Sequence, residues 1–278
     1  MELAMVNEQI MPLDEATISI HNRGVYFGDG VYEAIRVCRG RCFAFERHMS
    51  RLKYSLEQMD MSAKVDLDII RQRVAKVLAA SELAEATIYF QITRGEAYRH
   101  HTYAPDWEPM FLLTIRESKG RQIESGKAIT HPDWRWKRCD IKSLNLLANV
   151  LARQAATKAG AYEAILFDDN GYVTEATSST VLMVKGKQLI TTPLGTNILP
   201  GITRELVLNW GGELGMELIE RPFKVEEMFD ADELMVSGTS TEVLGLTQLD
   251  DKQIADGKVG FYTDELQKRL VDAMVNGL

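Results

Sequence analysis

A lysine with apolar neighbours is the first candidate for chemistry in this chain. Lys142 lies in the segment RCDIKSLNLL (138–147), where a polar stretch gives way to a helical pattern. Desolvation disfavours the ammonium form and lowers the pKa of a lysine, so that its amine can condense with a carbonyl group as a Schiff base. The same pattern also fits a lysine whose aliphatic stem covers apolar surface. Other segments must distinguish these two interpretations.

Two turns of small residues could bind a phosphate group. The segment PGITRE (200–205) predicts a helix start, where free backbone amides and the Thr203 hydroxyl can bind an anion. The segment SGTS (237–240) is a second turn of this kind. Each also fits a simple helix cap. Together with a lysine that can form a Schiff base, they indicate a ligand with an aldehyde and a phosphate, and pyridoxal phosphate is that ligand.

Pyridoxal phosphate needs an anionic partner that keeps its pyridine nitrogen protonated. Glu175 is the candidate, because it follows the turn Asn170–Gly171 and precedes an apolar strand. Ser178 and Ser179 come shortly after it and offer hydroxyls to the cofactor. An exposed glutamate at the end of a hairpin is the alternative interpretation.

The segment FGDGVYE (27–33) places two glycines and a tyrosine in a loop that leads into a strand. The dinucleotide pattern GxGxxG fails here because Glu33 stands where the third glycine belongs, and the pattern GxxxxGK[ST] occurs nowhere. These absences argue against nucleotide sites of the Rossmann and P-loop types. The glycines either let Tyr32 enter a cleft or form a tight turn beside a core tyrosine.

Composition and charge describe an ordinary globular protein of 278 residues, of which 45% are hydrophobic. Its 32 basic and 40 acidic residues give a net charge of −8, and no basic run suits a nucleic acid or an anionic membrane. We see neither a secretory leader nor a membrane-spanning stretch, so we expect a cytoplasmic protein. Three cysteines without a CxxC pair favour neither disulfides nor a zinc site, and no metal is expected.

Hydrophobic spacing predicts a succession of helices and strands. Apolar residues recur every three or four positions over 46–59 and 67–80, which predicts two helices. Segments rich in β-branched and aromatic residues predict strands over 87–95 and 110–115. Further along, the sequence predicts helices at 146–159 and after 200–203, strands at 128–130 and 164–167, hairpins turning at 168–171 and 185–187, and a last core strand at 233–236.

The polar stretch 116–122 interrupts two apolar regions and marks the best candidate for a domain boundary. We predict a smaller N-terminal α/β domain at 1–118, an interdomain linker at 119–123 and a larger C-terminal domain at 124–278 that carries Lys142. The predicted fold class is therefore α/β with α+β elements, in two domains.

Taken together, these segments resemble the class IV, or fold-type IV, pyridoxal-phosphate aminotransferases. The resemblance implies a two-domain fold with the cofactor at the domain interface. It also implies that Lys142 forms the internal aldimine and later moves the proton between the substrate Cα and the cofactor carbon. The matching segments keep one order from about Ile18 to Val259 and are FGDGVYE (27–33), the helix around Arg51, RCDIKSLNLL (138–147), YEAILFDDNGYVTEATSS (162–179) and LPGITRE (199–205).

The resemblance also assigns the other cofactor contacts. Glu175 would pair with the pyridine nitrogen, and Leu199 would lie against the ring. The residues expected to hold the phosphate are Arg51, Ile202, Thr203 and Thr239. From their own segments, 173–180 and 237–240, we also expect the hydroxyls of Ser178, Ser179 and Ser240 to bind the cofactor.

Within the family, the chain is most similar to the D-amino-acid transaminases. In that subgroup an arginine, a histidine two positions later and the loop tyrosine bind the substrate carboxylate, and Arg99, His101 and Tyr32 match them. An arginine fork with neutral donors would fix the carboxylate and so decide which face of Cα is presented. The adjacent His100 is expected to be a solvated loop residue. The resemblance further implies that Arg99 and His101 come from the neighbouring subunit of an obligate homodimer.

Two residues close to the lysine leave alternatives open. Arg138 could contact Glu175 or the surroundings of the cofactor, or it could be a surface or structural arginine. Cys139 is expected to be a small buried side chain, although it lies three residues before Lys142. The chain departs from the subgroup at three positions of the cofactor surroundings, Ala176, Thr180 and Gly238.

The sequence thus predicts a D-amino-acid aminotransferase that converts D-alanine and 2-oxoglutarate to pyruvate and D-glutamate. A branched-chain L-amino-acid aminotransferase or an aminodeoxychorismate lyase of the same fold is the first alternative. The second alternative is a non-catalytic protein that binds phosphate ligands through the turns at Thr203 and Thr239. That alternative leaves Lys142 and Glu175 unexplained. The expected partners are an amino acid, a 2-oxo acid and a second copy of the chain, without nucleic acid or membrane.

Overall fold

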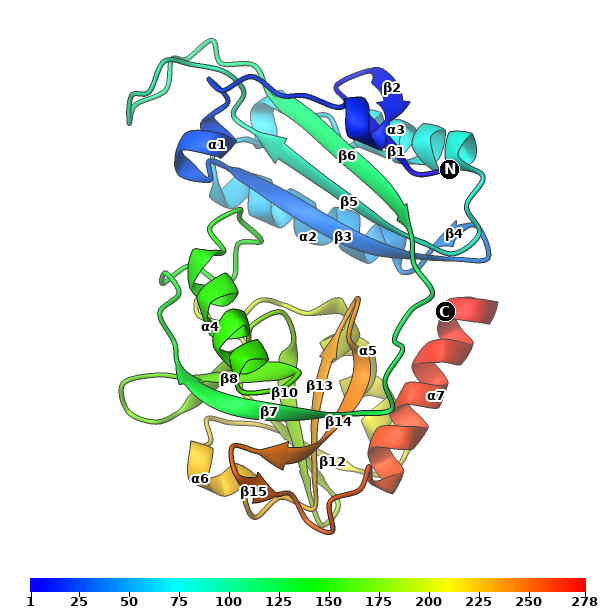
Figure 1. The fold of residues 1–278 in the computed structure, drawn as a ribbon, viewed down its shortest axis with the longest axis vertical. Coiled ribbons are helices and arrows are strands. Elements are labelled where there is room, and N and C mark those ends of the chain that lie inside the picture. The colour runs from blue at the N-terminus through cyan, green and yellow to red at the C-terminus, as the bar shows by residue number, and fades with distance from the viewer. The chain divides into compact units, whose positions relative to one another are not determined.

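The computed structural model describes all 278 residues and divides into two compact units (Figure 1). Unit 1 comprises Met1–Lys119 and Ile141–Asn145, and unit 2 comprises Gly120–Asp140 and Leu146–Leu278. The chain first leaves unit 1 between Lys119 and Gly120. The predicted domain limits of 1–118 and 124–278, with a linker at 119–123, remain a proposal.

The segment that carries Lys142 packs with unit 1, whereas the sequence led us to assign it to the C-terminal domain. An antiparallel bridge joins Val31 to Ser143. The amide of Tyr32 donates to the carbonyl of Lys142 at 2.9 Å, and the amide of Leu144 donates to the carbonyl of Gly30 at 3.1 Å. These backbone bonds add 141–145 to the start of a unit 1 strand, although the chain on both sides of the segment belongs to unit 2.

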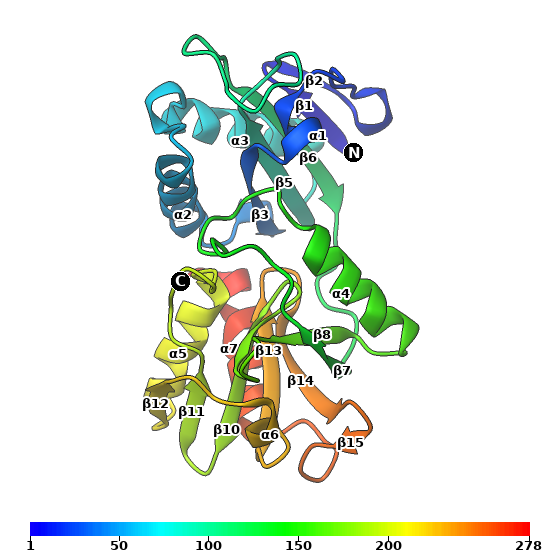
Figure 2. The same ribbon diagram turned by 90° about the vertical axis from the view of Figure 1, so that its left-hand side faces the viewer.

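Unit 1 is built on a six-stranded antiparallel sheet in the order β2-β1-β6-β5-β3-β4. Helices α2 and α3 lie on one face of this sheet (Figure 2). The elements of unit 1 are β1 (Leu3–Val6), β2 (Gln9–Pro12), a 3-10 turn (Leu13–Glu15), α1 (Arg23–Phe27), β3 (Gly30–Cys38), β4 (Arg41–Cys42), α2 (Phe45–Gln58), a second 3-10 turn (Ser62–Lys64), α3 (Leu67–Ser81), β5 (Ala86–Thr93) and β6 (Met110–Glu117).

The core of unit 1 confirms the helical spacing read from the sequence. Met49, Leu52 and Leu56 of α2 are buried in one cluster with Ile88 and Phe90 of β5. The alternation of buried and half-buried residues along β5 turns one side of the strand toward the helices. Because an amphipathic helix gains most of its stability from burying its apolar face, this cluster positions α2 and its charged residues on the sheet.

Unit 2 contains a nine-stranded mixed sheet with the order β12-β11-β10-β13-β14-β7-β8-β9, and β15 pairs with β14. The neighbours β11 and β12, β14 and β7, and β7 and β8 run parallel, and the other pairs run antiparallel. The elements are β7 (Ser125–Pro132), α4 (Leu147–Lys158), β8 (Glu163–Phe167), β9 (Val173–Ala176), β10 (Thr180–Lys185), β11 (Gln188–Thr191), α5 (Ile202–Glu213), β12 (Glu217–Glu220), α6 (Val225–Met228), β13 (Glu233–Gly238), β14 (Glu242–Leu249), β15 (Lys252–Gln253) and α7 (Phe261–Asn276).

Most predicted elements of unit 2 are confirmed, including the two hairpins β8-β9 and β10-β11. The prediction that 233–236 is the last core strand is wrong. Strand β14 follows it, pairs with both β13 and β7, and buries Val243, Leu244, Leu246 and Leu249. Helix α7, which packs on β14 (Figure 1), was not predicted either. No helix is long and apolar enough to cross a lipid bilayer.

Candidate active site

Lys142 meets an aromatic ring within unit 1. Its Nζ lies 4.1 Å from the centroid of the Tyr32 ring, in cation–π geometry. Its backbone amide donates to the Ser55 hydroxyl of α2 at 3.1 Å. No carboxylate lies within ion-pair distance of the amine. The structure therefore brings together two predicted site residues, Lys142 and Tyr32, and leaves the amine without a counter-ion of its own chain.

The predicted phosphate ligand Arg51 is held by a buried carboxylate. Its Nε and Nη2 donate to the two oxygens of Glu33 at 2.9 and 2.8 Å, which is a bidentate pair. Nδ1 of the buried His48 lies 2.7 Å from the same carboxylate. Burial by itself would raise the pKa of Glu33, but the charge and hydrogen bonds of Arg51 and His48 outweigh it and lower the pKa to about 2. Sequence reasoning assigned no role to Glu33 or His48.

We expect Glu33→Gln to lower the free energy of unfolding at pH 7 by about 3 kcal/mol, because it leaves the Arg51 charge buried without its anion. The depressed pKa of Glu33 means that the wild-type carboxylate stabilises the fold above pH 4.5 and loses this effect as the pH falls through about 2. The difference between variant and wild type should therefore shrink from pH 7 to pH 2, as measured by denaturant unfolding. A difference that is independent of pH would contradict the assignment.

Arg99 and His101 lie in the long loop between β5 and β6 (Figure 1). Both side chains are exposed, and both contact the ring of Phe27 in α1. The Arg99 guanidinium lies 5.5 Å from the ring centroid, and the His101 ring stands edge-on to it at 5.7 Å. His100 is exposed and its Nδ1 lies 2.7 Å from the Thr102 hydroxyl. The structure thus places Arg99 and His101 together on one aromatic ring.

The root of this loop depends on a glycine. Gly95 has a φ of +74°, and a Cβ added there would lie 1.9 Å from the Glu108 carbonyl oxygen. We expect Gly95→Ala to lower the free energy of unfolding by about 2–4 kcal/mol, since the backbone must move as well as adopt a strained φ. Gly40→Ala is the matched control, because Gly40 has a φ of +71° with nothing within 4 Å. Equal losses in thermal unfolding of the two variants would refute this prediction.

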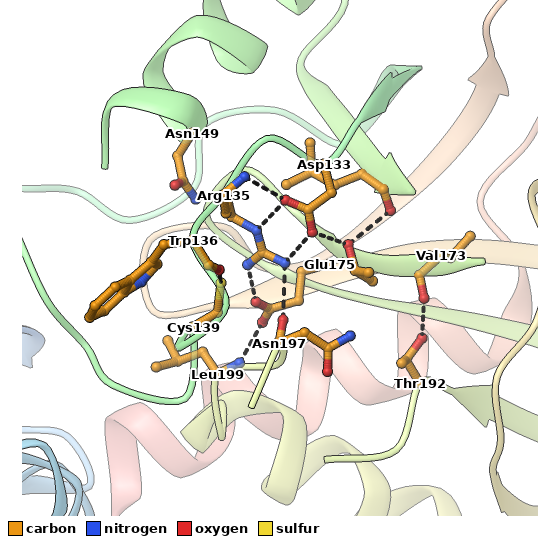
Figure 3. A network of polar contacts seen from close by, with 12 residues as sticks. Asp133, Arg135, Trp136, Cys139, Asn149, Val173, Glu175, Thr192, Asn197 and Leu199 are labelled. Atoms are coloured by element: carbon orange, nitrogen blue, oxygen red, sulfur yellow. Dashed lines mark hydrogen bonds and ion pairs between the residues drawn. The ribbon is translucent and has the colours of Figure 1, made fainter. Parts of the chain in front are cut away.

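Glu175 is the centre of a buried polar network in unit 2 (Figure 3). It lies on β9, is 5% exposed, and accepts hydrogen bonds from Arg135 and, at 3.1 Å, from the backbone amide of Leu199. Arg135 is itself fixed by Asp133, which accepts from its Nε at 2.9 Å and from its Nη2 at 2.8 Å. The Thr174 hydroxyl donates to Asp133 at 2.6 Å. The alternative interpretation of Glu175 as an exposed glutamate at the end of a hairpin is therefore wrong.

The electrostatics of Glu175 suit a partner that brings a positive charge or a proton. Burial raises its pKa to about 7, although the charge and hydrogen bond of Arg135 and the Leu199 amide act in the opposite direction. A carboxyl group with such a pKa is a common sign of a functional site. A protonated nitrogen facing this carboxylate would stabilise its charged form.

The arginine that contacts Glu175 is Arg135, and sequence reasoning considered Arg138 instead. Arg138 donates from Nε and Nη2 to Asp140, at 3.0 Å in both cases. Both arginines stand in one polar segment, so their order in the sequence could not identify the partner of Glu175. Cys139 is buried, as expected, and its thiol donates to the Trp136 carbonyl. Burial raises the pKa of this thiol to about 12, which makes it a poor nucleophile.

The predicted phosphate-binding turns of unit 2 contain unsatisfied polar groups. Helix α5 begins at Ile202 and has no side-chain cap at its N-cap, Gly201. Thr203, in the first turn, is buried. The hydroxyl of Ser237, at the end of β13, is buried and has no hydrogen-bond partner. Free amides at a helix start and an unpaired buried hydroxyl both fit the oxygen atoms of a phosphate.

Two short distances show how closely these turns approach the loop after Glu175. A Cβ at Gly201 would lie 3.1 Å from the Thr180 hydroxyl, and a Cβ at Gly238 would lie 3.2 Å from the Ser178 carbonyl. No larger residue fits at either glycine without a shift of its neighbours.

The predicted hydroxyl ligands differ in their surroundings. Ser179 is buried, and its hydroxyl already donates to the Glu163 carboxylate of β8 at 3.0 Å. Ser178 and Ser240 are exposed, and Thr239 is half-buried. The sequence identified the turn that begins at Ser237 but assigned the phosphate to Thr239 and gave Ser237 itself no role.

The chain matches a known family of enzymes along most of its length. The sequence model of the amino-transferase class IV family matches residues 30–249. The chain is 35% identical to the D-alanine aminotransferase of Listeria innocua over 277 residues, which cover 98% of this chain and 96% of the relative. It is 36% identical to that of Bacillus licheniformis, covering 98% and 97%, and 37% identical to that of Staphylococcus aureus, covering 96% of each. The chain belongs to the class IV aminotransferases.

Solved structures agree at the level of the fold. The branched-chain amino acid aminotransferase from Escherichia coli superposes with a TM-score of 0.89 at 23% identity, covering 99% of this chain and 95% of the other. That from Thermoproteus uzoniensis, solved with norvaline, gives a TM-score of 0.88 at 22% identity, with the same coverage. A further branched-chain enzyme of this fold, with a TM-score of 0.92 at 22% identity, was solved with pyridoxamine 5'-phosphate. The protein is therefore a transaminase with the two-domain fold-type IV architecture, in a family that depends on pyridoxal phosphate.

Proposed function

We propose that the protein is a pyridoxal-phosphate-dependent D-amino-acid aminotransferase that converts D-alanine and 2-oxoglutarate to pyruvate and D-glutamate. The observation that carries the proposal is the identity of 34–37% with enzymes named D-alanine aminotransferase over nearly the whole chain. The loop residues Arg99 and His101, which share the Phe27 ring, supply the expected carboxylate ligands. The likeness to branched-chain aminotransferases, at 22–23% identity, speaks for the fold alone.

The groups described above fit pyridoxal phosphate in three respects. The Lys142 amine has no counter-ion and is available for a carbonyl carbon. Glu175 is a buried carboxyl with a raised pKa, which suits a protonated pyridine nitrogen. The uncapped start of α5 and the unpaired Ser237 hydroxyl suit a phosphate. We propose Arg51, Ile202, Thr203 and Thr239 as phosphate ligands, with Leu199 against the ring and Ser178, Ser179 and Ser240 around it.

When bound, the cofactor supplies an electron sink for the carbanion formed at the substrate Cα. The chain supplies positioning and proton transfer. The Lys142 amine would hold the cofactor at its aldehyde carbon and, when free, would move the proton at the substrate Cα. The carboxylate of Glu175 would hold the pyridine nitrogen in its protonated form, and Arg135 and Asp133 keep Glu175 in place. Arg99, His101 and Tyr32 orient the substrate carboxylate and so select one hand of Cα.

We further propose that the protein works as a homodimer in which Arg99 and His101 serve the active site of the neighbouring subunit. One helix face supports the presence of a partner. Leu147, Val150 and Leu151 recur at helical spacing on α4 and are 72%, 59% and 48% exposed. Large apolar side chains gathered on one face mark an interaction surface. The three free cysteines are compatible with the reducing cytoplasm, which we propose as the location.

A stereochemical assay tests the proposed function. Purified holoenzyme is given D-alanine or L-leucine, each with 2-oxoglutarate, and formation of the two 2-oxo acids is followed separately. We expect turnover with D-alanine and little with L-leucine. Turnover with L-leucine alone would refute the D-specificity and favour the branched-chain alternative. Cofactor-free protein that leaves the absorption spectrum of added pyridoxal phosphate unchanged would refute the proposal that this compound is the cofactor.

A further inference from the structure

A buried arginine at the start of α1 holds the loop that carries Arg99 and His101. Arg23 is 3% exposed, and all three of its guanidinium nitrogens donate hydrogen bonds. Nη1 donates to the carbonyls of His100 at 2.7 Å and Thr102 at 3.3 Å, and Nη2 donates to the carbonyl of His101 at 3.2 Å. Three successive carbonyls of the loop therefore converge on one side chain.

The guanidinium is itself fixed by charged neighbours. Its Nε donates to Asp29 at 2.8 Å, and the same carboxylate accepts from Nε of the buried Arg94 at 3.1 Å. Nη2 of Arg94 donates in turn to the carbonyl of Met59, the C-cap residue directly after α2. The two arginines share one carboxylate, so the cluster keeps an excess positive charge beside the loop. A planar fork in a rigid setting is well suited to hold backbone carbonyls in one arrangement.

The root of the loop is tied to the same short segment. The amide of Arg23 donates to the Gly95 carbonyl at 2.8 Å, and the amide of Ala97 donates to the His21 carbonyl at 3.0 Å. The Arg23 guanidinium also lies 4.9 Å from the Phe27 ring, which contacts the side chains of Arg99 and His101. Residues 21–29 thus hold the loop backbone at its root and at 100–102, and support its two functional side chains.

We propose that Arg23 is a positioning residue for recognition of the substrate carboxylate. It fixes the backbone of 100–102, and through it the placement of Arg99 and His101, without touching the substrate. This inference rests on the proposed function, in which Arg99 and His101 bind the carboxylate of the amino acid and of the 2-oxo acid. The 2-oxo acid carries the same α-carboxylate, so its binding must depend on Arg23 in the same way.

Arg23→Met tests the proposal in the holoenzyme. We expect KM for D-alanine and for 2-oxoglutarate to rise at least about tenfold, because small displacements of an orienting group weaken binding of the group it orients. The change in kcat should stay within about threefold, and the visible spectrum of the bound cofactor should not change. Arg23→Lys keeps the charge but loses the fork, and its KM values should lie between those of wild type and Arg23→Met.

Arg36→Met is the matched control for general loss of stability. Arg36 is also a buried arginine of unit 1, and it donates to the carbonyls of Ala86 and Ser118 and to Glu85. Its KM values should stay within about twofold of wild type. Unchanged KM values in both Arg23 variants, or an equal rise in Arg36→Met, would overturn the proposal.

Two further results separate this proposal from the proposed function. If Arg23→Met does not fold, Arg23→Lys is examined by amide hydrogen exchange, and exchange over 96–108 must be faster than in wild type for the proposal to stand. If wild-type enzyme does not use D-alanine, the proposed function fails, and the KM comparison is made with the amino acid that it does use. A rise in that KM with Arg23→Met alone supports Arg23 as a positioning residue, and an unchanged KM overturns it.

Discussion

Lys142→Ala should reduce transamination by at least about 10³-fold, the largest effect that we expect from a single substitution. The variant lacks the only amine that we assign to the cofactor carbonyl, and in the proposed function the same amine moves the proton at Cα. The absorbance that pyridoxal phosphate acquires on binding the wild-type protein should also be lost or shifted. Activity and absorption spectra of the purified variant, with cofactor added, measure both effects.

Two controls separate chemistry from folding in this variant. Lys137→Ala removes an exposed lysine five positions earlier and should leave turnover and spectrum unchanged. Methylamine added to Lys142→Ala should restore part of the turnover, because a soluble amine can take over the proton transfer. If Lys142→Ala kept wild-type absorbance and turnover, the assignment of Lys142 to the cofactor carbonyl would be refuted.

Glu175→Gln should lower kcat by about 10²-fold or more, while pyridoxal phosphate still binds. Glutamine has nearly the same shape as glutamate, but its neutral amide cannot stabilise a protonated pyridine nitrogen. Glu175→Asp retains the charge and should retain more activity than Glu175→Gln. Steady-state kinetics of the three proteins provide the comparison, and wild-type kcat in Glu175→Gln would contradict the role.

The raised pKa of Glu175 makes a separate prediction for the cofactor-free protein. A carboxyl whose pKa is about 7 in the folded state and 4.5 in the unfolded state destabilises the fold as the pH rises from 4.5 through 7. Glutamine does not titrate, so wild type should lose stability relative to Glu175→Gln over this interval. Denaturant unfolding at pH 5 and pH 8 measures the difference. The loss of activity in Glu175→Gln would then not be attributable to a weakened fold at pH 8.

Local sequence patterns predicted those helices and turns that are defined by residues close together in the sequence. The spacing of Met49, Leu52 and Leu56 identified α2, and Asn170–Gly171 identified the turn between β8 and β9. Such signals are short-range, because a helix or a tight turn is defined by residues that are close in sequence. Pyridoxal phosphate could likewise be predicted as the cofactor, because the residue types that indicate it lie next to Lys142 and Glu175 in the sequence.

Contacts between distant segments could not be predicted in this way. Nothing near Arg51 indicates that Glu33, 18 positions away, forms a bidentate pair with it. Arg135 and Glu175 are 40 positions apart and meet because β7 and β8 run parallel and β9 returns beside β8. Charged residues of this kind look like ordinary surface residues until the fold places them together and removes water.

The membership of Ile141–Asn145 in unit 1 has a consequence for how the chain is made. A ribosome that has released only residues 1–119 has delivered a sheet whose strand β3 still lacks the backbone bonds to Lys142 and Leu144. Those bonds can form only after the first strand of unit 2 has been synthesised. The lysine thus enters its place only about halfway through translation, when residues of both units are already present, and a nascent fragment that ends before it lacks the amine that we propose for the cofactor.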